Sequence, residues 1–457
     1  MIALLALTQR PEAQQSYGLV VHLVMGGWYP LCFALFIFMK PARAVALGLV
    51  AGFLLLPKAS YDFPGFPNYD KALSIVLGVF VAALLFDSGR LLTWRPRKID
   101  IPMAILCVAP FLSAVINGDG AYEGVSNTFD FSMRWGLPWI LGRVYFHEFE
   151  AQKILAATIV GGALIYVPFA LYEIKMSPML HKDVYGIALK SFKHAQRGGG
   201  LWRPNVFISH GLAYGLYNGL AGMLAFWLWY AKSKRSVLNI PMGTCAAILI
   251  AMAFAAQSMG AVALMGGGIA VLMLGARYRL VAPLVLCLAA PPVYIGLRQV
   301  FRWDGEELLE LAQGVFGKER AISLNVRLAN EAALADRILQ KPWFGFNDFR
   351  DFTGNTDEKH AATVDSMWLL YLGLYGAVSL IGLYGFQLTA PGLLWRKLPP
   401  EYWGHPVFAS AVALGLTSAL VSLDGLMNAV EIAAFTCAGG GVAHLLGTPE
   451  GRELWTS

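Results

Sequence analysis

Long apolar stretches separated by short polar loops run along almost the whole chain. Most are close to the roughly 20 residues that a helix needs to cross the hydrocarbon core of a bilayer. Two are short enough to be re-entrant or packed segments, so the pattern predicts an all-α integral membrane protein with about 12–13 transmembrane helices. The predicted spans are 17–39, 43–57, 72–89, 101–116, 134–147, 152–173, 206–230, 239–257, 260–276, 280–297, 366–388, 406–423 and 427–446.

Lysine and arginine gather in every second loop, for example at 90–98 and 232–235. Positive charge of this kind marks cytoplasmic loops, so we expect the alternate loops on the outer face. Two long polar segments belong to the outer set.

The expected organisation therefore has three parts. Residues 1–297 carry about ten transmembrane helices and a basic outer loop at 173–205. Residues 298–365 form a large extracytoplasmic loop with short helices, and residues 366–457 hold the C-terminal transmembrane helices.

Composition agrees with a membrane protein. Hydrophobic residues make up 57% of the chain and charged residues 14%, whereas a soluble domain carries roughly 25% charged residues. Much of the net charge of +6 lies in the loop clusters, so we expect no nucleic-acid partner. The P-loop, the HExxH zinc motif and the GxSxG motif are absent from the sequence, which argues against ATP-driven transport and the common hydrolases.

The outer segment 173–205 is basic on the side where basic charge is unusual, and it ends in three glycines, Arg203 and Pro204. Proline suits the first turn of a helix, and the N-terminus of a helix favours an anion. We predict that Arg197 and Arg203 bind phosphate or pyrophosphate, with His210 nearby in the following span. An interfacial loop that contacts anionic lipid headgroups is the alternative.

The second outer segment contains a predicted amphipathic helix at 323–340, because leucine and alanine recur there at spacings of three and four. Arg327 and Arg337 on this helix are candidate ligands for a phosphate group, since guanidinium binds phosphate bidentately. Arg327 and Glu331 lie one turn apart, so a solvated ion pair is the simpler interpretation.

Asp365 and His360 end this segment, just before the span at 366–388. Either side chain could take a proton from an attacking hydroxyl group. Asp365 could instead be the N-cap of the span, and His360 an exposed loop histidine.

Three charged residues fall within or beside predicted spans, where charge is costly. Arg143 lies near a cytoplasmic end and could extend its side chain to the interface. Asp424 is placed in a short outer turn, and Glu431 one turn into the last span.

The stretch from Arg327 to Glu331, followed by Arg337 and by Pro342-Trp343-Phe344-Gly345-Phe346, resembles the O-antigen ligase and O-antigen polymerase superfamily. The span that contains Gly373-Leu374-Tyr375-Gly376 is similar to a glycine-repeat span of that family. The family has a His-Asn pair where this chain has Asp365-Ser366, and it often has Ser-Arg-Gly where this chain has Ser258-Met259-Gly260. The turn ends in Gly345-Phe346-Asn347 without a second glycine. The Asp-Ser form looks more like the exopolysaccharide polymerase members.

The resemblance implies a metal-independent glycosyltransferase without a cofactor in the bacterial inner (cytoplasmic) membrane. Its donor would be a glycan on undecaprenyl pyrophosphate, and its acceptor a sugar hydroxyl at the outer face. Membrane lipids and other polysaccharide export proteins are the further expected partners. A transporter or lipid flippase, and a non-catalytic scaffold of an export assembly, are the alternatives.

Overall fold

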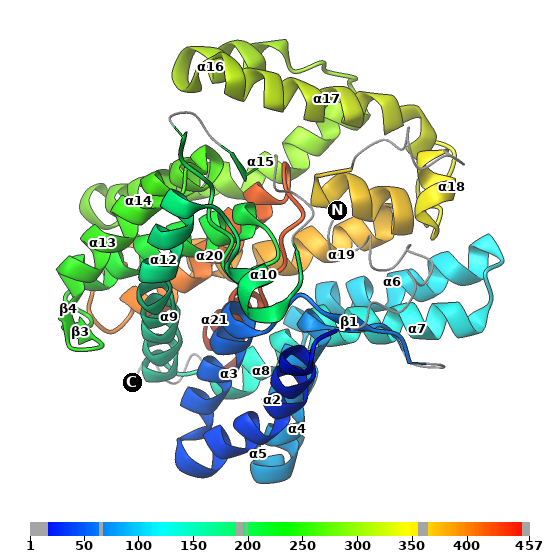
Figure 1. Ribbon diagram of the computed structural model, residues 1–457. Coiled ribbons are helices and arrows are strands. Elements are labelled where there is room, and N and C mark those ends of the chain that lie inside the picture. The colour runs from blue at the N-terminus through cyan, green and yellow to red at the C-terminus, as the bar shows by residue number, and fades with distance from the viewer. Residues whose placement is uncertain (1–16, 64–66, 189–194, 197–199, 355–363, 450–457) are drawn as a thin grey trace.

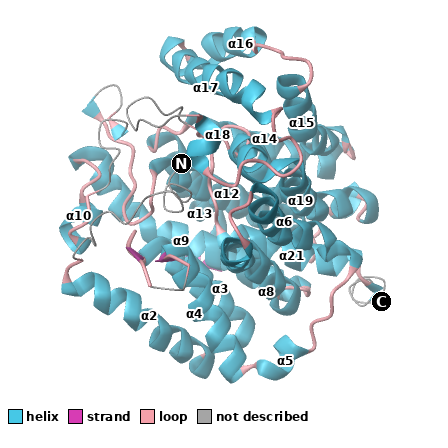
Figure 2. Cartoon of the chain, turned by 90° about the vertical axis from the view of Figure 1, so that its right-hand side faces the viewer, coloured by secondary structure: helices cyan, strands magenta, loops and turns pink. Residues whose placement is uncertain are grey.

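The computed structural model describes residues 17–63, 67–188, 195–196, 200–354 and 364–449 (Figure 1). Most of the ribbon is helical (Figure 2). Within these residues the strands form two small antiparallel hairpins. They are β1 (Ser60–Tyr61) with β2 (Tyr69–Asp70), and β3 (Ser236–Val237) with β4 (Ile240–Pro241). The predicted all-α class is confirmed.

The helices of the N-terminal part are α2 (Leu19–Phe38), α3 (Pro41–Leu55), α4 (Lys71–Phe86), α5 (Ser88–Leu92), η1 (Lys98–Asp100), α6 (Ile101–Asn117), α7 (Ala121–Phe131), the π-helical turn η2 (Ser132–Gly136), α8 (Leu137–Tyr145), α9 (Phe149–Met176) and α10 (Leu180–Tyr185). Most of them follow the predicted apolar stretches, whereas α7 and α10 lie between these stretches.

The C-terminal part begins after the first long outer segment. Its helices are α12 (Gly211–Tyr230), α13 (Met242–Ala255), α14 (Met259–Tyr278), α15 (Ala282–Gln299), α16 (Glu306–Phe316), α17 (Lys318–Ile338), α18 (Phe349–Thr353), α19 (Met367–Lys397), η4 (Pro400–Tyr402), α20 (Ala409–Asp424) and α21 (Ala433–Gly447).

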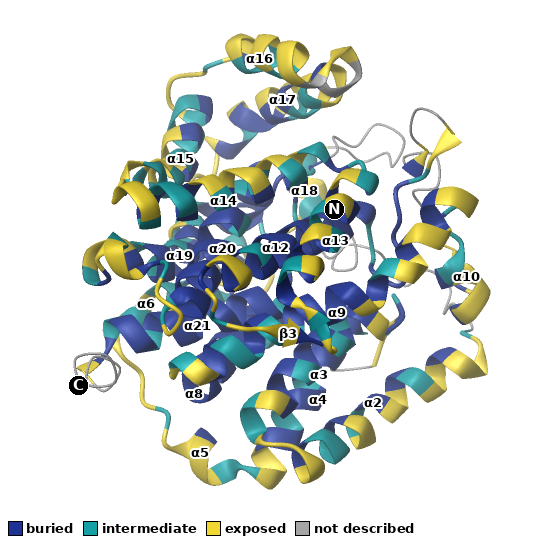
Figure 3. Ribbon diagram, turned by 90° about the vertical axis from the view of Figure 1, so that its left-hand side faces the viewer, coloured by how far each residue is buried: buried dark blue, intermediate teal, exposed yellow. Residues whose placement is uncertain are grey.

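Apolar helices of membrane-crossing length are the main feature of this fold. Among the described residues five helices qualify by length and composition, and further apolar helices of 10–17 residues accompany them. The five are Leu19–Phe38, Lys98–Asn117, Phe149–Met176, Met259–Tyr278 and Met367–Lys397. Buried residues concentrate along α9, α12, α20 and α21, whereas α16 is largely exposed (Figure 3). The number of crossings, the sidedness of the loops and the three-part organisation stay predictions.

Two predicted spans begin later than expected. Pro204 does not lie in the first turn of a helix, because α12 begins at Gly211. Val206 has a positive φ of 53°, a left-handed conformation that interrupts a helix. The last span likewise loses its first residues, since 427–432 are not helical and α21 begins at Ala433.

Helix α19 is broken at Gly376, whose φ of 72° and ψ of −173° lie outside the helical region. The chain that precedes α18 fills the break. The Phe346 amide donates to the Gly373 carbonyl at 2.9 Å, and the Ala377 amide donates to the Pro342 carbonyl at 2.8 Å. Irregular backbone within an apolar helix is tolerated where protein satisfies the freed groups, as here.

Helices α16 and α17 form a hairpin at one end of the bundle, visible at the top of Figure 1. The predicted helix at 323–340 is confirmed, and it starts five residues earlier, at Lys318. Leu328, Leu334 and Ile338 bury one face of α17 in a core cluster shared with α19. This packing places the polar residues of α17 directly over the start of α19.

Candidate functional site

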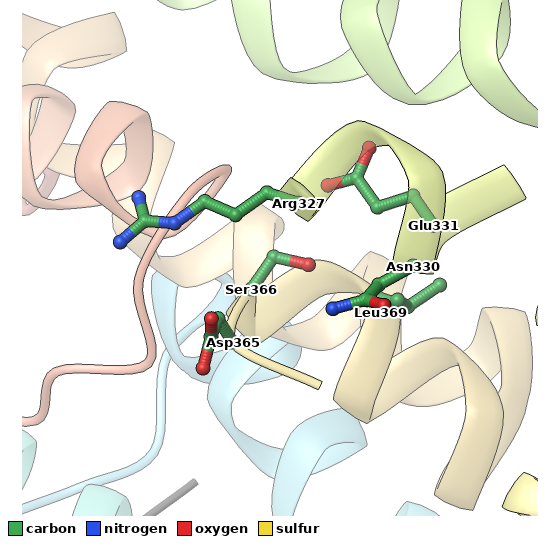
Figure 4. Close-up of a pocket in the computed structure, with 6 residues that line it drawn as sticks. All are labelled: Arg327, Asn330, Glu331, Asp365, Ser366 and Leu369. Atoms are coloured by element: carbon green, nitrogen blue, oxygen red, sulfur yellow. The ribbon is translucent and has the colours of Figure 1, made fainter. Parts of the chain in front are cut away.

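A recess lies between α17 and the start of α19 (Figure 4). It holds about 190 Å³ of space not filled by atoms, part of which is open to solvent. Its lining residues are Arg327, Asn330, Glu331, Asp365, Ser366 and Leu369. The structure thus brings together Arg327 and Asp365, two of the side chains that the sequence marked as site residues.

Glu331 is not the solvated partner of Arg327 that the sequence suggested. Its side chain is buried and accepts hydrogen bonds from Tyr294 Oη at 2.8 Å, Arg298 Nε at 3.0 Å and Trp368 Nε1 at 3.2 Å. Burial raises the pKa of the Glu331 carboxyl, although these partners oppose the shift. The hydrogen bonds of Glu331 therefore connect α17 to α15 and α19.

Arg298, the charged partner of Glu331, is itself completely engaged. Its Nη1 donates to the Trp303 carbonyl at 2.5 Å, and its Nη2 donates to the Leu328 carbonyl at 2.5 Å. The Arg327 side chain extends away from α17, past Ser366 (Figure 4).

Arg327 is half-buried and makes no hydrogen bond to the residues that the structure describes. Its guanidinium interacts electrostatically with Asp424, at the end of α20. A guanidinium carries five N–H donors in a planar fork that suits phosphate oxygens. Arg327 is therefore able to bind an anion that enters the recess.

Asp365 does not cap α19. The N-cap is Ser366, and the hydroxyl of Ser366 makes no capping hydrogen bond. Asp365 is half-buried, and no group in the described ranges donates a hydrogen bond to its carboxylate. The N-cap interpretation of Asp365 is wrong, because the helix begins one residue later than that role requires.

Arg337 does not line this recess. Its Nη2 and Nε donate to the Asp351 carbonyl at 2.6 and 3.2 Å, and its guanidinium lies 5.0 Å from the centre of the Phe346 ring. These contacts join the end of α17 to α18. The geometry favours the structural interpretation of Arg337 over the ligand-binding one.

Arg203 is also outside the recess. It is buried against Gly211, and its Nη2 donates to the Gln257 carbonyl at 3.2 Å. His210 is the N-cap of α12, where its Nδ1 accepts from the Leu212 amide at 3.1 Å, so it lies before the span and not one turn inside it. Arg197 and His360 lie outside the described residues.

The backbone groups expected to bind phosphate near Arg203 already have an anion. The Glu173 carboxylate accepts from the amides of Asn205 and Val206 at 2.8 and 2.7 Å. It also accepts from the Leu180 amide at 3.0 Å, which closes the first outer segment onto the end of α9. The phosphate-binding role of this backbone is therefore taken by the protein's own carboxylate.

A buried charge cluster escaped the sequence analysis. Arg134 Nε donates to both oxygens of Asp130 at 2.8 Å, and its Nη2 donates to Asp70 at 2.8 Å. Glu431 interacts electrostatically with the same guanidinium and accepts from Tyr371 Oη at 3.4 Å. Arg134 opens a predicted span and has an acid four residues before it, which was the available signal.

Arg143 shows that a charged residue in a predicted span need not reach the interface. It is buried and pairs with Asp100, which also accepts from Trp139 Nε1 at 2.8 Å. The expectation that Arg143 extends to the membrane surface is wrong, because its counter-ion comes from the neighbouring segment.

In the part of the chain that the structure describes, no three acidic, histidine or cysteine side chains form a group that could hold a metal ion. No protein-family model matches the sequence, and no curated protein matches it. The fold defines a class, a mostly helical protein with several helices suited to a multi-pass membrane protein.

Proposed function

We propose that this protein is a metal-independent glycosyltransferase at the outer face of the membrane. It transfers a glycan from an undecaprenyl-pyrophosphate donor to a sugar hydroxyl, as a polysaccharide polymerase or ligase. The observation that carries the proposal is the shared recess of Arg327 and Asp365. Neither side chain is held by a hydrogen bond from the described residues.

The chemistry of such a transfer needs what these two side chains offer. The bond from the sugar's anomeric carbon to the pyrophosphate oxygen breaks, and a bond from that carbon to the acceptor oxygen forms. Arg327 would stabilise the negative charge of the leaving pyrophosphate. Asp365 would orient the acceptor hydroxyl and take its proton. Arg197, Arg203 and His360 stay further candidates for binding and proton transfer.

The test is Asp365→Asn, which keeps the size of the side chain and removes its ability to take a proton. Because Asp365 is not the N-cap, the variant should accumulate in the membrane like the wild type. In a strain that lacks the gene, it should restore little surface glycan and leave lipid-linked saccharide unused.

Asp351→Asn is the matched control, since this exposed acid of α18 lies outside the recess. An active Asp365→Asn protein would transfer the proposed base role to His360, to be tested as His360→Ala. Full activity of both variants would rule out catalysis by this segment.

A transporter or lipid flippase is the second candidate, favoured by the break in α19 and by the Arg134 cluster between helices. Transporters build their sites from broken helices and buried charges. The two functions predict different locations for the unused lipid-linked saccharide. In intact cells without a transferase it is open to an added glycosidase, and without a flippase it is protected.

A further inference from the structure

The Arg134 cluster contains more acid than its arginine can neutralise. Three carboxylates, from Asp70, Asp130 and Glu431, surround one guanidinium, whose side chain is only 5% exposed. A cluster with this excess of negative charge would repel the pyrophosphate group of a donor. It is therefore distinct in chemistry from the Arg327 recess.

Two polar atoms in the cluster lack partners among the residues that the structure describes. Nη1 of Arg134 is buried without a hydrogen-bond acceptor, although Nε and Nη2 are both bound. On Glu431, one oxygen accepts from Tyr371, and the described chain donates nothing to the other oxygen. Buried polar groups are nearly always paired, so the buried Arg134 Nη1 is expected to donate to a further acceptor.

The unmet atoms specify the chemistry of that group. It must accept a hydrogen bond from Arg134 Nη1 and donate one to Glu431. A hydroxyl group does both, whereas an anion cannot donate. A metal ion does not fit, because Arg134 occupies the facing oxygens of Asp70 and Asp130.

Aromatic rings belong to the same hairpin as Asp70 of the cluster. Asp70 ends strand β2, and Tyr69 in the same strand packs near Phe63, which packs on Tyr61, with ring centres 6.1 and 6.2 Å apart. Phe63 is 50% exposed. A sugar ring offers an apolar face to such rings and hydroxyl groups to neighbouring charged side chains, which distinguishes it from a lone water molecule.

We infer that the Arg134 cluster and the aromatic rings of β1 and β2 form a sugar-binding subsite. On the proposed glycosyltransferase function, on which this inference rests, the subsite holds the acceptor glycan. The segment 424–432 borders both sites, since Asp424 interacts with Arg327 and Glu431 interacts with Arg134. A glycan bound at the cluster thus lies on the same short segment as the recess of the donor.

The test measures binding of an oligosaccharide released by mild acid from the surface glycan of cells that carry the gene. Saturation-transfer NMR on the full-length protein in detergent gives the dissociation constant. Glu431→Gln and Phe63→Ala should each weaken binding about tenfold or more, since a charged acceptor or an aromatic contact is lost. Phe254→Ala is the matched control, because this ring on α13 is similarly exposed at 58% and lies on another helix.

The outcomes separate this inference from the proposed function. Arg327→Ala should abolish transfer and leave oligosaccharide binding unchanged, because it removes only the donor site. The subsite would be overturned if the wild type did not bind the oligosaccharide, or if Glu431→Gln and Phe63→Ala bound it as tightly as the wild type. The rings of β1 and β2 would then be part of an aromatic belt at the membrane interface. A third outcome is that Glu431→Gln and Phe63→Ala weaken binding while Asp365→Asn and Arg327→Ala keep full transfer activity. This outcome would support the subsite and reject the proposed donor site.

Discussion

Arg298 and Arg134 are both buried and both pair with carboxylates, yet their surroundings differ in one respect. Every nitrogen of Arg298 that bears a proton donates to Glu331 or to a backbone carbonyl. Arg134 keeps one nitrogen unmet and faces three carboxylates. The first arrangement is complete among the described residues, and the second leaves Arg134 Nη1 without an acceptor there.

This difference distinguishes an ion pair with a structural role from a charge cluster with a proposed ligand-binding role. A fully bonded ion pair fixes elements relative to one another, and losing one partner is costly because the other charge stays buried. An unbalanced cluster adds less to stability, since repulsion among its acids offsets part of the attraction to the arginine. We therefore expect substitutions of the partners of Arg298 to affect mainly stability, and substitutions of the partners of Arg134 to affect mainly ligand binding.

The largest expected effect on stability follows from Arg298→Leu. The change leaves Glu331 buried without its counter-ion, which should cost about 3–5 kcal/mol in the free energy of unfolding. The midpoint of thermal unfolding in detergent should fall, and protease should cut α17 more readily. Arg302→Leu is the control, because Arg302 pairs with Asp336 at the exposed surface, where such pairs contribute about 0–1 kcal/mol. Equal unfolding of the two variants would contradict the supporting role of Arg298.

His181 in the first outer segment is, like Arg298, a buried side chain with its nitrogens hydrogen-bonded, and its burial leads us to expect a pH effect on stability. Its Nε2 accepts from the Lys58 amide at 3.0 Å, and its other ring nitrogen lies 2.9 Å from the Ile187 carbonyl. Burial lowers the pKa of the His181 imidazole to about 4, whereas an unfolded histidine titrates near about 6.5.

The folded state therefore binds fewer protons, so its stability rises with pH. The contribution is complete above the unfolded pKa and is lost as pH falls toward the folded pKa, with a total of roughly 3 kcal/mol. The protection factor for hydrogen exchange of α10, which is corrected for the intrinsic exchange rate at each pH, should fall between pH 7 and 4.5, and His181→Asn should flatten that dependence. A wild-type profile as flat as that of the variant would show that His181 is not the cause.

The smallest expected effects compare Glu331→Gln with Glu431→Gln, the same chemical change at the two sites. Glu331→Gln should lower the free energy of unfolding by about 1.5–3 kcal/mol, since bonds to a charged acceptor are lost. Glu431→Gln should change it by no more than about 0.5 kcal/mol, because it removes one of three mutually repelling acids. The reverse order in denaturant unfolding would mean that Glu431 is the supporting acid.

The sequence predicted the helices better than it predicted the backbone between them. The spans at 101–116 and 260–276 agree with α6 and α14 to within two residues, because a long apolar run has few alternatives to a helix. The residues at 206–210 and 427–432 were wrongly assigned to helices. Both segments contain apolar residues that are buried in protein, and hydropathy does not distinguish a buried loop from a buried helix.

Side-chain roles were predictable from the sequence only in part. Arg327 and Asp365 meet in one recess as the sequence suggested, but Glu331 turned out to pair with Arg298 on another helix. Spacing along one helix favours a local pair and carries no information on a partner in another helix. The Arg134 cluster was missed for the same reason, since Asp70 and Glu431 come from distant segments.

The break in α19 restricts which sequences can adopt this fold. A side chain at Gly376 would lie 2.2 Å from the Trp343 backbone, and one at Gly345 would lie 2.4 Å from the Leu374 backbone. Each glycine also has a positive φ, so neither position accepts another residue without strain. The two glycines should therefore be inherited together. A paired pattern, Phe-Gly-Phe before the helix and Leu-Tyr-Gly within it, gives a way to recognise distant homologues whose other residues have diverged.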